Sequence, residues 1–180
     1  QSGGGITKQM LTARDAMELK DRPTRFIAYL QAYTNTYAPR EELKRIYDEA
    51  TGFSPDVIGL MIGTRPDCVN DELLDYFANL SKQYYIMIEY GIESTSDRTL
   101  EFINRGHNYT CAEEAIRTTA ARGIRTGAHL ILGLPHEDRT TILNHARKIS
   151  ELPLTALKLH QLQIVKRTQM ARQFAEHPEW

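Results

Sequence analysis

The chain has 180 residues, 41% of them hydrophobic and 25% charged, with a formal net charge of −1 and a sequence pI near 6.7. This size and composition match one globular domain with a substantial core, and they exclude a disordered chain. Because the charge is close to neutral, the sequence lacks the basic footprint of a nucleic-acid or membrane-surface protein, and we expect a small-molecule or cofactor site.

Helical and strand-like segments alternate through the first half of the chain. Residues 6–20 have the pattern of a helix, and residues 26–31 form a strand-like apolar run. A helix over residues 39–52 begins at a proline and ends at a glycine, as helices commonly do. Residues 57–63 are the second strand, and Asn70 is the expected N-cap of the helix that follows it.

The same alternation continues in the second half. A third strand spans residues 85–92, and two short helices follow it, the second with the capping-box pattern Thr110-x-x-Glu113. Residues 127–134 give a fourth apolar strand, which is followed by another helix. Residues 156–165 give the fifth strand.

This order of five strands separated by helices predicts a fold class. Strands that are apolar on both faces and joined by helical crossovers indicate a parallel sheet, either open and doubly wound or curved into a (β/α) barrel. Because no G-x-G-x-x-G turn follows any strand, the dinucleotide-binding version of the open sheet is disfavoured. We therefore predict an α/β protein with a partial TIM-like barrel, and a single domain over residues 1–180.

Two further features limit the location and the chemistry of the chain. No apolar run approaches the roughly 20 residues that a membrane span needs, and no signal peptide is visible, so we expect a soluble cytoplasmic protein without a membrane partner. The cysteines, Cys68 and Cys111, lie far apart and belong to no C-x-x-C cluster. We expect two reduced thiols and no metal ligands in this chain.

Polar residues gather where the predicted strands end. In parallel α/β folds the ligand lies at the carboxyl edge of the strands, because loops and helix N-termini converge there. The candidate binding residues in these strand ends and the adjoining loops are Gln31, Tyr33, Thr34, Thr64, Arg65, Glu89, Glu93, Arg105, His129 and Gly133.

Several of these residue types suit a ribose or an amino acid. Carboxylates such as Glu89 and Glu93 and an imidazole such as His129 can accept the hydroxyl protons of a ribose. Arg105 follows a short helix that begins near Ser96, and its guanidinium can hold a ligand carboxylate with two parallel hydrogen bonds. Simpler roles stay open: Glu89 paired with a nearby Arg or Lys, and His129 as a hydrogen-bonded core residue.

The last strand offers a different chemistry. Lys158 and His160 alternate with Leu157 and Leu159, so both polar side chains lie on one face of the strand. A lysine in such a place can form a Schiff base with a carbonyl substrate. A complete lyase or aldolase-type barrel that uses Lys158, with Glu89 or His160 as proton carrier, is therefore an open alternative, and a non-catalytic binding module is another.

Five segments of the chain form a set of motifs: Phe26 to Pro39, Ile62 to Cys68, Glu89 to Asp97, Arg98 to His107 and His129 to Glu137. In this order they resemble the motifs of the radical S-adenosylmethionine superfamily, and the likeness covers nearly the whole chain. Within the superfamily the sequence is similar to the bacterial YhcC-like group, which is related to the elongator-type enzymes.

The resemblance implies a six-stranded partial (β/α) barrel, S-adenosylmethionine as cofactor, and a four-iron four-sulfur cluster held by a C-x-x-x-C-x-x-C loop after the first strand. Enzymes of this family generate a 5′-deoxyadenosyl radical that removes a hydrogen atom from the substrate. The chain contains no such cysteine loop. We therefore expect a fragment, truncated at both ends, that lacks the first strand and the cluster ligands and is inactive by itself.

The family's motifs also assign roles to individual residues. The resemblance implies that residues 31–34 meet the methionine amino group, although the usual glycine pair is replaced there. It implies ribose contacts for Glu93 and His129, and a contact with the methionine carboxylate for Arg105. Residues 131–135 would pack on the adenine.

Two expectations concern partners beyond the small-molecule cofactor. RNA is a candidate substrate by analogy with the elongator-type relatives, although the charge of this chain gives it no support. A missing first strand would leave the edge of strand 26–31 unpaired, and we expect the fragment to self-associate through that edge.

Overall fold

The computed structural model describes residues 5–17 and 25–177. In chain order, the helices and strands are α1 (Ile6–Ala16), β1 (Phe26–Leu30), α2 (Arg40–Thr51), β2 (Val57–Thr64), η1 (Pro66–Cys68), α3 (Asp71–Leu80), β3 (Tyr85–Glu93), α4 (Asp97–Phe102), α5 (Tyr109–Ala121), β4 (Arg125–Leu132), α6 (Arg139–Ser150), β5 (Ala156–Gln161) and α7 (Gln169–Glu176). The predicted alternation of strands and helices is confirmed. The predicted extension of the first helix to residue 20 lies partly outside the described residues.

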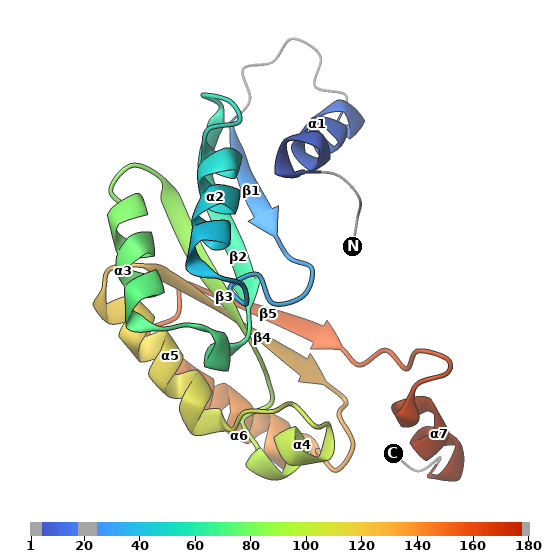
Figure 1. Cartoon of the computed structure of the whole chain (residues 1–180). Helices are drawn as coiled ribbons and strands as arrows, with labels where there is room; N and C mark the ends of the chain where they lie inside the picture. Colours follow the sequence, from blue (N-terminus) through green and yellow to red (C-terminus); the bar gives the residue numbers. More distant parts are fainter. Residues whose placement is uncertain (1–4, 18–24, 178–180) are drawn as a thin grey trace.

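The five strands form one parallel sheet in the order β1-β2-β3-β4-β5. Helices α2, α3, α5 and α6 cover one face of this sheet (Figure 1). The other face is concave. On this face Lys158 Nζ of β5 lies 3.3 Å from Tyr29 Oη of β1, although the two strands form opposite edges of the sheet. A flat five-stranded sheet would hold its outer strands roughly 19 Å apart. The sheet is therefore curled into a half-barrel, as predicted.

The core lies between the sheet and its covering helices. Alternate residues of each strand point to this side, because successive side chains of a strand point to opposite faces. On β3 these are Ile86, Ile88, Tyr90 and Ile92, each with no exposed surface. The helices contribute apolar side chains at helical spacing, including Leu43, Tyr47, Leu74, Phe77, Ile116 and Ile149. The remaining residues of each strand point to the concave side of the sheet.

Two helix starts match the sequence prediction and one differs from it. Asn70 caps α3 and Ser96 caps α4, each by accepting a hydrogen bond from a backbone N–H three residues later. The capping box predicted at Thr110 is wrong, because α5 begins two residues earlier and Asn108 Oδ1 accepts the Cys111 N–H at 2.9 Å. Thr110 therefore lies inside the first turn.

The last strand is shorter than predicted. Pairing of β5 with β4 ends at Leu132 and Gln161, and the Leu162 N–H makes one further bond to the Leu132 carbonyl. β4 stops there because Gly133 turns the chain with a φ of 88°. Residues 163–165 consequently have no strand partner within the described chain, and they form a loop.

Within the described residues, no helix combines the length and the apolar composition that crossing a membrane requires.

Candidate functional site

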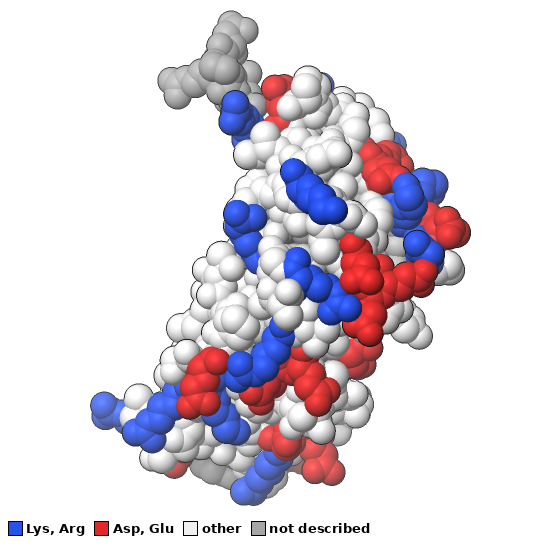
Figure 2. Space-filling view, turned by 90° about the vertical axis from the view of Figure 1, so that its left-hand side faces the viewer, with Lys and Arg blue, Asp and Glu red and all other residues white. Residues whose placement is uncertain are grey.

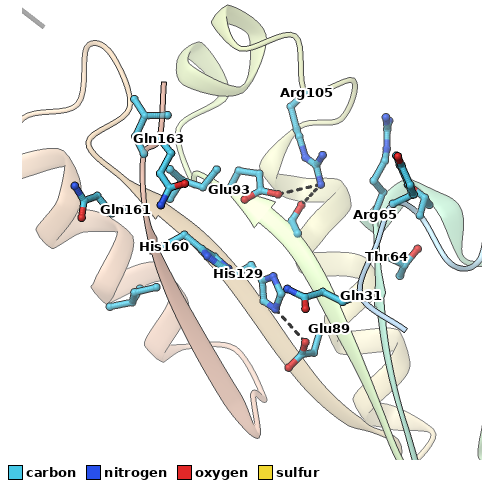
Figure 3. Close-up of a pocket in the computed structure, with 17 residues that line it drawn as sticks. Gln31, Thr64, Arg65, Glu89, Glu93, Arg105, His129, His160, Gln161 and Gln163 are labelled. Carbon is cyan, nitrogen blue, oxygen red and sulfur yellow. Dashed lines mark hydrogen bonds and ion pairs between the residues drawn. The ribbon is translucent and has the colours of Figure 1, made fainter. Parts of the chain in front are cut away.

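A pocket of about 680 Å³ opens on the concave side of the half-barrel, at the carboxyl ends of the parallel strands (Figure 3). Its volume is typical of small-molecule sites, and its place in the fold is where parallel α/β proteins bind ligands. Each strand, or the segment that follows it, contributes to the lining: Gln31, Tyr33, Thr34, Gly63, Thr64, Arg65, Glu89, Gly91, Glu93, Arg105, His129, Ile131, Leu159, His160, Gln161, Leu162 and Gln163.

The structure brings together every binding residue expected from the sequence except Gly133. Gly133 is exposed in the turn after β4 and does not line the pocket. Sequence reasoning missed Tyr29 and Gln163. The first could have been found, because Tyr29 lies two residues before Gln31 and so shares its face of the strand. Gln163 lies in the loop after β5, where strand alternation gives no signal.

Four polar side chains from β1, β3, β4 and β5 meet inside the half-barrel, and we call Tyr29, Glu89, His129 and Lys158 the interior layer. Glu89 Oε2 lies 2.5 Å from Tyr29 Oη and 3.1 Å from His129 Nε2. Lys158 Nζ donates to Tyr29 Oη at 3.3 Å. Barrel interiors are usually filled by apolar side chains, and a buried carboxylate needs partners. Glu89 finds them in Tyr29 and His129, rather than in the neighbouring Arg or Lys considered from the sequence.

Burial shifts the pKa of two members of the interior layer, Tyr29 and His129. Removal of water, reinforced by the adjacent Glu89 carboxylate, raises the pKa of Tyr29 well above its ordinary value, so the phenol keeps its proton. Burial also lowers the pKa of His129, although Glu89 opposes this shift. The His129 side chain is 15% exposed, and its ring lies 5.1 Å from that of His160, centroid to centroid. A neutral imidazole therefore stands at the wall of the pocket.

Glu93 and Arg105 form an ion pair at the end of β3. Arg105 Nη2 lies 3.3 Å from Glu93 Oε1 and donates to the Gly91 carbonyl oxygen at 2.6 Å. Burial lowers the pKa of Arg105, which Glu93 opposes, and an arginine still stays charged. Glu93 has a positive φ of 69° where the pairing with β4 becomes irregular, and such irregularities re-aim side chains. As expected, the guanidinium reaches the barrel mouth.

Gly91 makes this arrangement possible. A Cβ at position 91 would lie 2.7 Å from Arg105 Nη2 and 2.7 Å from Glu93 Oε1. These distances are too short for non-bonded atoms, so any larger residue would push both charged groups from the strand end. The absent side chain is therefore what lets Arg105 and Glu93 lie over the backbone of β3.

The residues after β2 are held by internal partners. Arg65 binds the Asp67 carboxylate through two hydrogen bonds, from Nε at 2.8 Å and from Nη2 at 2.6 Å. Its guanidinium lowers the pKa of Asp67. Thr64 Oγ1 lies 2.5 Å from Thr36 Oγ1, and both side chains are buried. Most hydrogen-bonding groups of Thr64 and Arg65 are therefore used within the protein. The contact between Thr36 and Thr64 also joins the loop after β1 to the end of β2.

A second buried network links the ends of β3 and β4 on the side of the helices. Ser94 Oγ donates to Glu137 Oε1 at 2.5 Å, and His145 Nε2 on α6 lies 3.1 Å from the same oxygen. Thr95 Oγ1 lies 2.7 Å from His145 Nδ1. Burial alone would raise the pKa of Glu137, but the contact with His145 and the hydrogen bond from Ser94 lower it overall. The network ties the segment after Glu93 to the segment after Gly133.

Metal-binding capacity is absent from the described part of the chain, where no three His, Cys, Asp or Glu side chains are grouped so that they could hold an ion. Cys68 and Cys111 are free thiols, and burial raises the pKa of each.

Comparison with known proteins points to one family. Residues 11–149 match the family model described as the Radical SAM superfamily. The protein YtqA of Bacillus subtilis is 37% identical over 175 residues, which cover 95% of this chain and 54% of that protein. The chain thus spans about half the length of the curated relatives that it matches.

Solved structures share the fold. The archaeal Elp3 of Methanocaldococcus infernus superposes with a TM-score of 0.74 at 15% identity, over 95% of this chain and 44% of that one. Coproporphyrinogen III oxidase of Escherichia coli, described as a radical SAM enzyme, superposes with a TM-score of 0.66 at 15% identity, over 93% of this chain and 38% of that one. At such low identities the likeness establishes the fold alone.

Proposed function

The chain belongs to the radical S-adenosylmethionine superfamily, and on that premise we propose that its pocket binds S-adenosylmethionine as part of a radical enzyme. Members of this superfamily use that cofactor together with a four-iron four-sulfur cluster. One observation carries the proposal: Glu93, Arg105 and His129, which lie far apart in the sequence, converge on one pocket (Figure 3).

The donors and acceptors of the pocket fit an adenosyl amino acid. Glu93 and His129 supply two acceptors for a ribose, and Ile131 supplies an apolar surface for a base. Arg105 uses Nε and Nη2 for internal bonds, whereas its Nη1 makes no hydrogen bond within the described residues. That nitrogen is free to donate to a ligand carboxylate. The space left by Gly91 keeps Arg105 and Glu93 side by side at the mouth.

The proposed contacts follow from this arrangement. Glu93 and His129 bind the ribose hydroxyl groups, and Arg105 binds the methionine carboxylate. Residues 31–34 approach the methionine amino group, and residues 131–135 pack against the adenine. Gly133 acts in this scheme through the turn that it permits after β4, since its own atoms do not line the pocket.

The described residues do not fit the iron–sulfur cluster. Three cysteine thiolates are needed, and this chain has Cys68 and Cys111 alone. The cluster ligands therefore belong to other parts of the parent protein in this proposal, and the chain as printed is inactive. When bound at a cluster, S-adenosylmethionine supplies a radical that removes a hydrogen atom from the substrate. The residues of this chain bind and orient the cofactor and keep water away from it.

The deciding experiment uses the intact gene expressed without oxygen. The purified protein should contain iron and should release 5′-deoxyadenosine from S-adenosylmethionine when a reductant is added. The variant Arg105→Met should keep the iron but bind S-adenosylmethionine at least tenfold more weakly, because the loss of a charged hydrogen bond is worth about 1.5–3 kcal/mol. Intact protein that binds iron but neither binds nor cleaves S-adenosylmethionine would refute the proposal.

A matched control separates the pocket from general electrostatics. Arg117 on α5 carries the same charge as Arg105, but it pairs with Glu113 on the helix surface, 2.8 Å away. The variant Arg117→Met should retain the affinity for S-adenosylmethionine within about twofold, because exposed ion pairs contribute little. Equal losses in both variants would point to nonspecific destabilisation.

The formal net charge of −1 gives no support to an RNA substrate over a small molecule. Figure 2 shows a helix-covered flank of the molecule, on which basic and acidic side chains lie beside one another. Ion pairs join some of the charged side chains of the described residues, such as Arg122 with both Asp71 and Asp75. RNA-binding surfaces usually carry an excess of basic groups. In this proposal the substrate is recognised by the parts of the pocket that the cofactor does not fill.

The aldolase-type alternative finds little support in the geometry. Lys158 does not line the pocket, and its ammonium donates to Tyr29 within the interior layer. It also lies over the Tyr29 ring, 5.2 Å from the centroid. Both contacts direct the Lys158 nitrogen toward Tyr29, whereas a Schiff-base lysine must reach the carbonyl carbon of a substrate.

A further inference from the structure

We propose that Glu89 is a positioning residue that fixes His129 in the tautomer protonated on Nε2, so that Nδ1 offers a lone pair to a hydroxyl group of the ligand. The inference rests on the proposed function in one respect, namely that the hydroxyl belongs to a ribose. It concerns a side chain that does not act on the ligand itself but determines how its neighbour does.

Lys158 determines which groups donate and which accept in the hydrogen bonds of the interior layer. An ammonium group has three N–H donors and no acceptor, so Lys158 Nζ must donate to Tyr29 Oη. Lys158 has no carboxylate within ion-pair distance among the described residues, so its bond to Tyr29 faces no competing acid. The phenol oxygen therefore acts as the acceptor in this contact.

Tyr29 in turn donates its hydroxyl proton to Glu89. Because the Tyr29 oxygen accepts from Lys158, its own proton points elsewhere, and Glu89 Oε2 lies 2.5 Å away. The phenol keeps that proton, since burial and the carboxylate both oppose its loss. Tyr29 therefore donates to Glu89, and Glu89 Oε2 is an acceptor.

Glu89 in turn selects the protonated nitrogen of His129. Because Glu89 Oε2 accepts from Tyr29, the nitrogen that approaches the same oxygen at 3.1 Å carries the proton of this contact. That nitrogen is Nε2. A neutral imidazole has one N–H, which leaves Nδ1 without a proton.

The neutral state of His129 follows from all of its surroundings. Burial is the largest influence and lowers its pKa, and the positive charge of Lys158 and the neighbouring His160 on β5 act in the same direction. Glu89 on β3 opposes them by attraction and by its hydrogen bond. Tyr29 on β1 stays uncharged. The net shift keeps the imidazole neutral at pH 7, where it presents a donor to Glu89 and an acceptor on its other side.

This arrangement has a consequence for recognition. Figure 3 shows His129 between Glu89 on one side and the open pocket on the other, with Glu93 farther along the wall. Glu93 is also an acceptor, so the pocket offers two acceptors to a ligand with two hydroxyl donors. A ribose meets this requirement. A ligand that places only acceptors at this wall does not.

Nuclear magnetic resonance of the chain labelled with nitrogen-15 at histidine tests the tautomer directly. The sequence has six histidines, and the signals of His129 are assigned by their loss in the variant His129→Gln. At pH 7.5 we expect a pyrrole-type signal for Nε2 and a pyridine-type signal for Nδ1. The opposite tautomer, or a doubly protonated ring at this pH, would overturn the inference.

The variant Glu89→Leu tests the role of Glu89. Tyr29 and His129 both contact Glu89 Oε2, so leucine leaves the Nε2 proton of His129 without an acceptor, and we expect the Nε2–H tautomer to be lost or reduced. The conservative variant Glu89→Gln can place its amide oxygen where Oε2 lies, accept from both neighbours and keep the Nε2–H tautomer. The variant Tyr29→Phe leaves Glu89 in place and should also keep it. A His129 spectrum that is unchanged in Glu89→Leu would refute the positioning role.

A surface variant with the same chemical change is the control. Glu113 lies on α5 and pairs with Arg117, 2.8 Å away, so Glu113→Leu should leave the His129 signals unchanged. The same spectral change in Glu89→Leu and Glu113→Leu would show that the tautomer responds to net charge rather than to the Glu89 contact.

The acceptor role is tested with 5′-methylthioadenosine, which has the ribose and adenine but no amino-acid carboxylate and therefore needs no cluster. Binding should shift the His129 Nδ1 signal, and Glu89→Leu should weaken binding about threefold to tenfold, the effect of one hydrogen bond. Binding without a shift at Nδ1 would overturn this role. Failure of the proposed function would differ: the intact protein would release no 5′-deoxyadenosine, while His129 kept its Glu89-dependent tautomer.

Discussion

Arg105 lies directly over Gly91, with its Nη2 2.6 Å from the Gly91 carbonyl oxygen and 3.3 Å from Glu93 Oε1. This contact requires three features of the chain. The loop after α4 must return to β3, the strand must lack a side chain at its end, and Glu93 must adopt a left-handed backbone conformation. The arrangement should therefore be sensitive to mutation at Gly91, a position that has no side chain.

The variant Gly91→Ala should disrupt the pocket without unfolding the domain. The new Cβ would lie 2.7 Å from both Arg105 Nη2 and Glu93 Oε1, which are the ends of flexible side chains and can move away. We expect at least a tenfold loss in affinity for S-adenosylhomocysteine, measured by calorimetry on the intact protein. The unfolding free energy should fall by about 1 kcal/mol, at the low end for added core volume.

Gly59 provides the contrasting substitution. A Cβ at position 59 would lie 2.2 Å from the backbone oxygen of Tyr85, and a paired strand cannot move away as a side chain can. Gly59→Ala should therefore lower the unfolding free energy by about 3 kcal/mol in urea denaturation. If Gly91→Ala were the more destabilising of the two, the assignment of Gly91 to the site rather than to stability would be wrong.

The fold could be predicted because its signals are local and repeated. Apolar strands and helices with caps such as Asn70 alternate along the chain, and a parallel sheet is the arrangement that satisfies them. Strand ends then bring distant residues to one edge, which is why Glu93 and His129 could be named in advance. The interior layer could not be derived in the same way. The contact between Tyr29 and Lys158 depends on how far the sheet curls, and no residue pattern encodes that curvature.

The sequence predicted that polar residues cap the helix N-termini, but it did not always predict which residue is the cap. Asn108 and Thr110 are both good N-cap residues, and the glutamate at position 113 made the later one attractive. Gly106 decides between them. Its φ is 84°, a conformation that favours glycine, and two residues later Asn108 has the extended backbone of an N-cap.

This correction can be measured. Asn108→Ala removes the acceptor for the Cys111 N–H and should lower the unfolding free energy by about 1 kcal/mol. Thr110→Ala removes no capping bond and should change it by less than about 0.5 kcal/mol. Urea denaturation of the two variants gives the comparison, and a larger effect at Thr110 would favour the capping box instead.

The outer edge of β1 leads to a prediction about association. Within the described chain β1 pairs only with β2, so its other edge carries unpaired backbone groups. Ile27 on this strand is 39% exposed. Such an edge can pair with another chain, and a charged residue on it prevents this. We expect concentration-dependent dimers of the printed chain in sedimentation experiments and a shift toward monomer in Ile27→Lys. A wild-type chain that stays monomeric at all concentrations would contradict the prediction.

The Glu137 network should make stability depend on pH in a defined direction. Burial would raise the Glu137 pKa, but the contact with His145 and the hydrogen bond from Ser94 hold it below its ordinary value of 4.5. A lowered folded-state pKa means that the stabilisation is fully present above about pH 4.5 and is lost as the pH falls through the folded-state value. Replacement by glutamine removes this dependence, because an amide does not titrate.

Glu137→Gln should therefore lower the unfolding free energy by about 1–3 kcal/mol at pH 7, since buried hydrogen-bonded charges contribute amounts of this order. The difference from the wild type should shrink as the pH is reduced below about 4.5. Glu113→Gln, which removes an exposed ion pair with Arg117, should lower it by less than about 1 kcal/mol at pH 7. A wild-type advantage over Glu137→Gln that grows toward low pH would show that the Glu137 carboxylate is strained rather than stabilised by its partners.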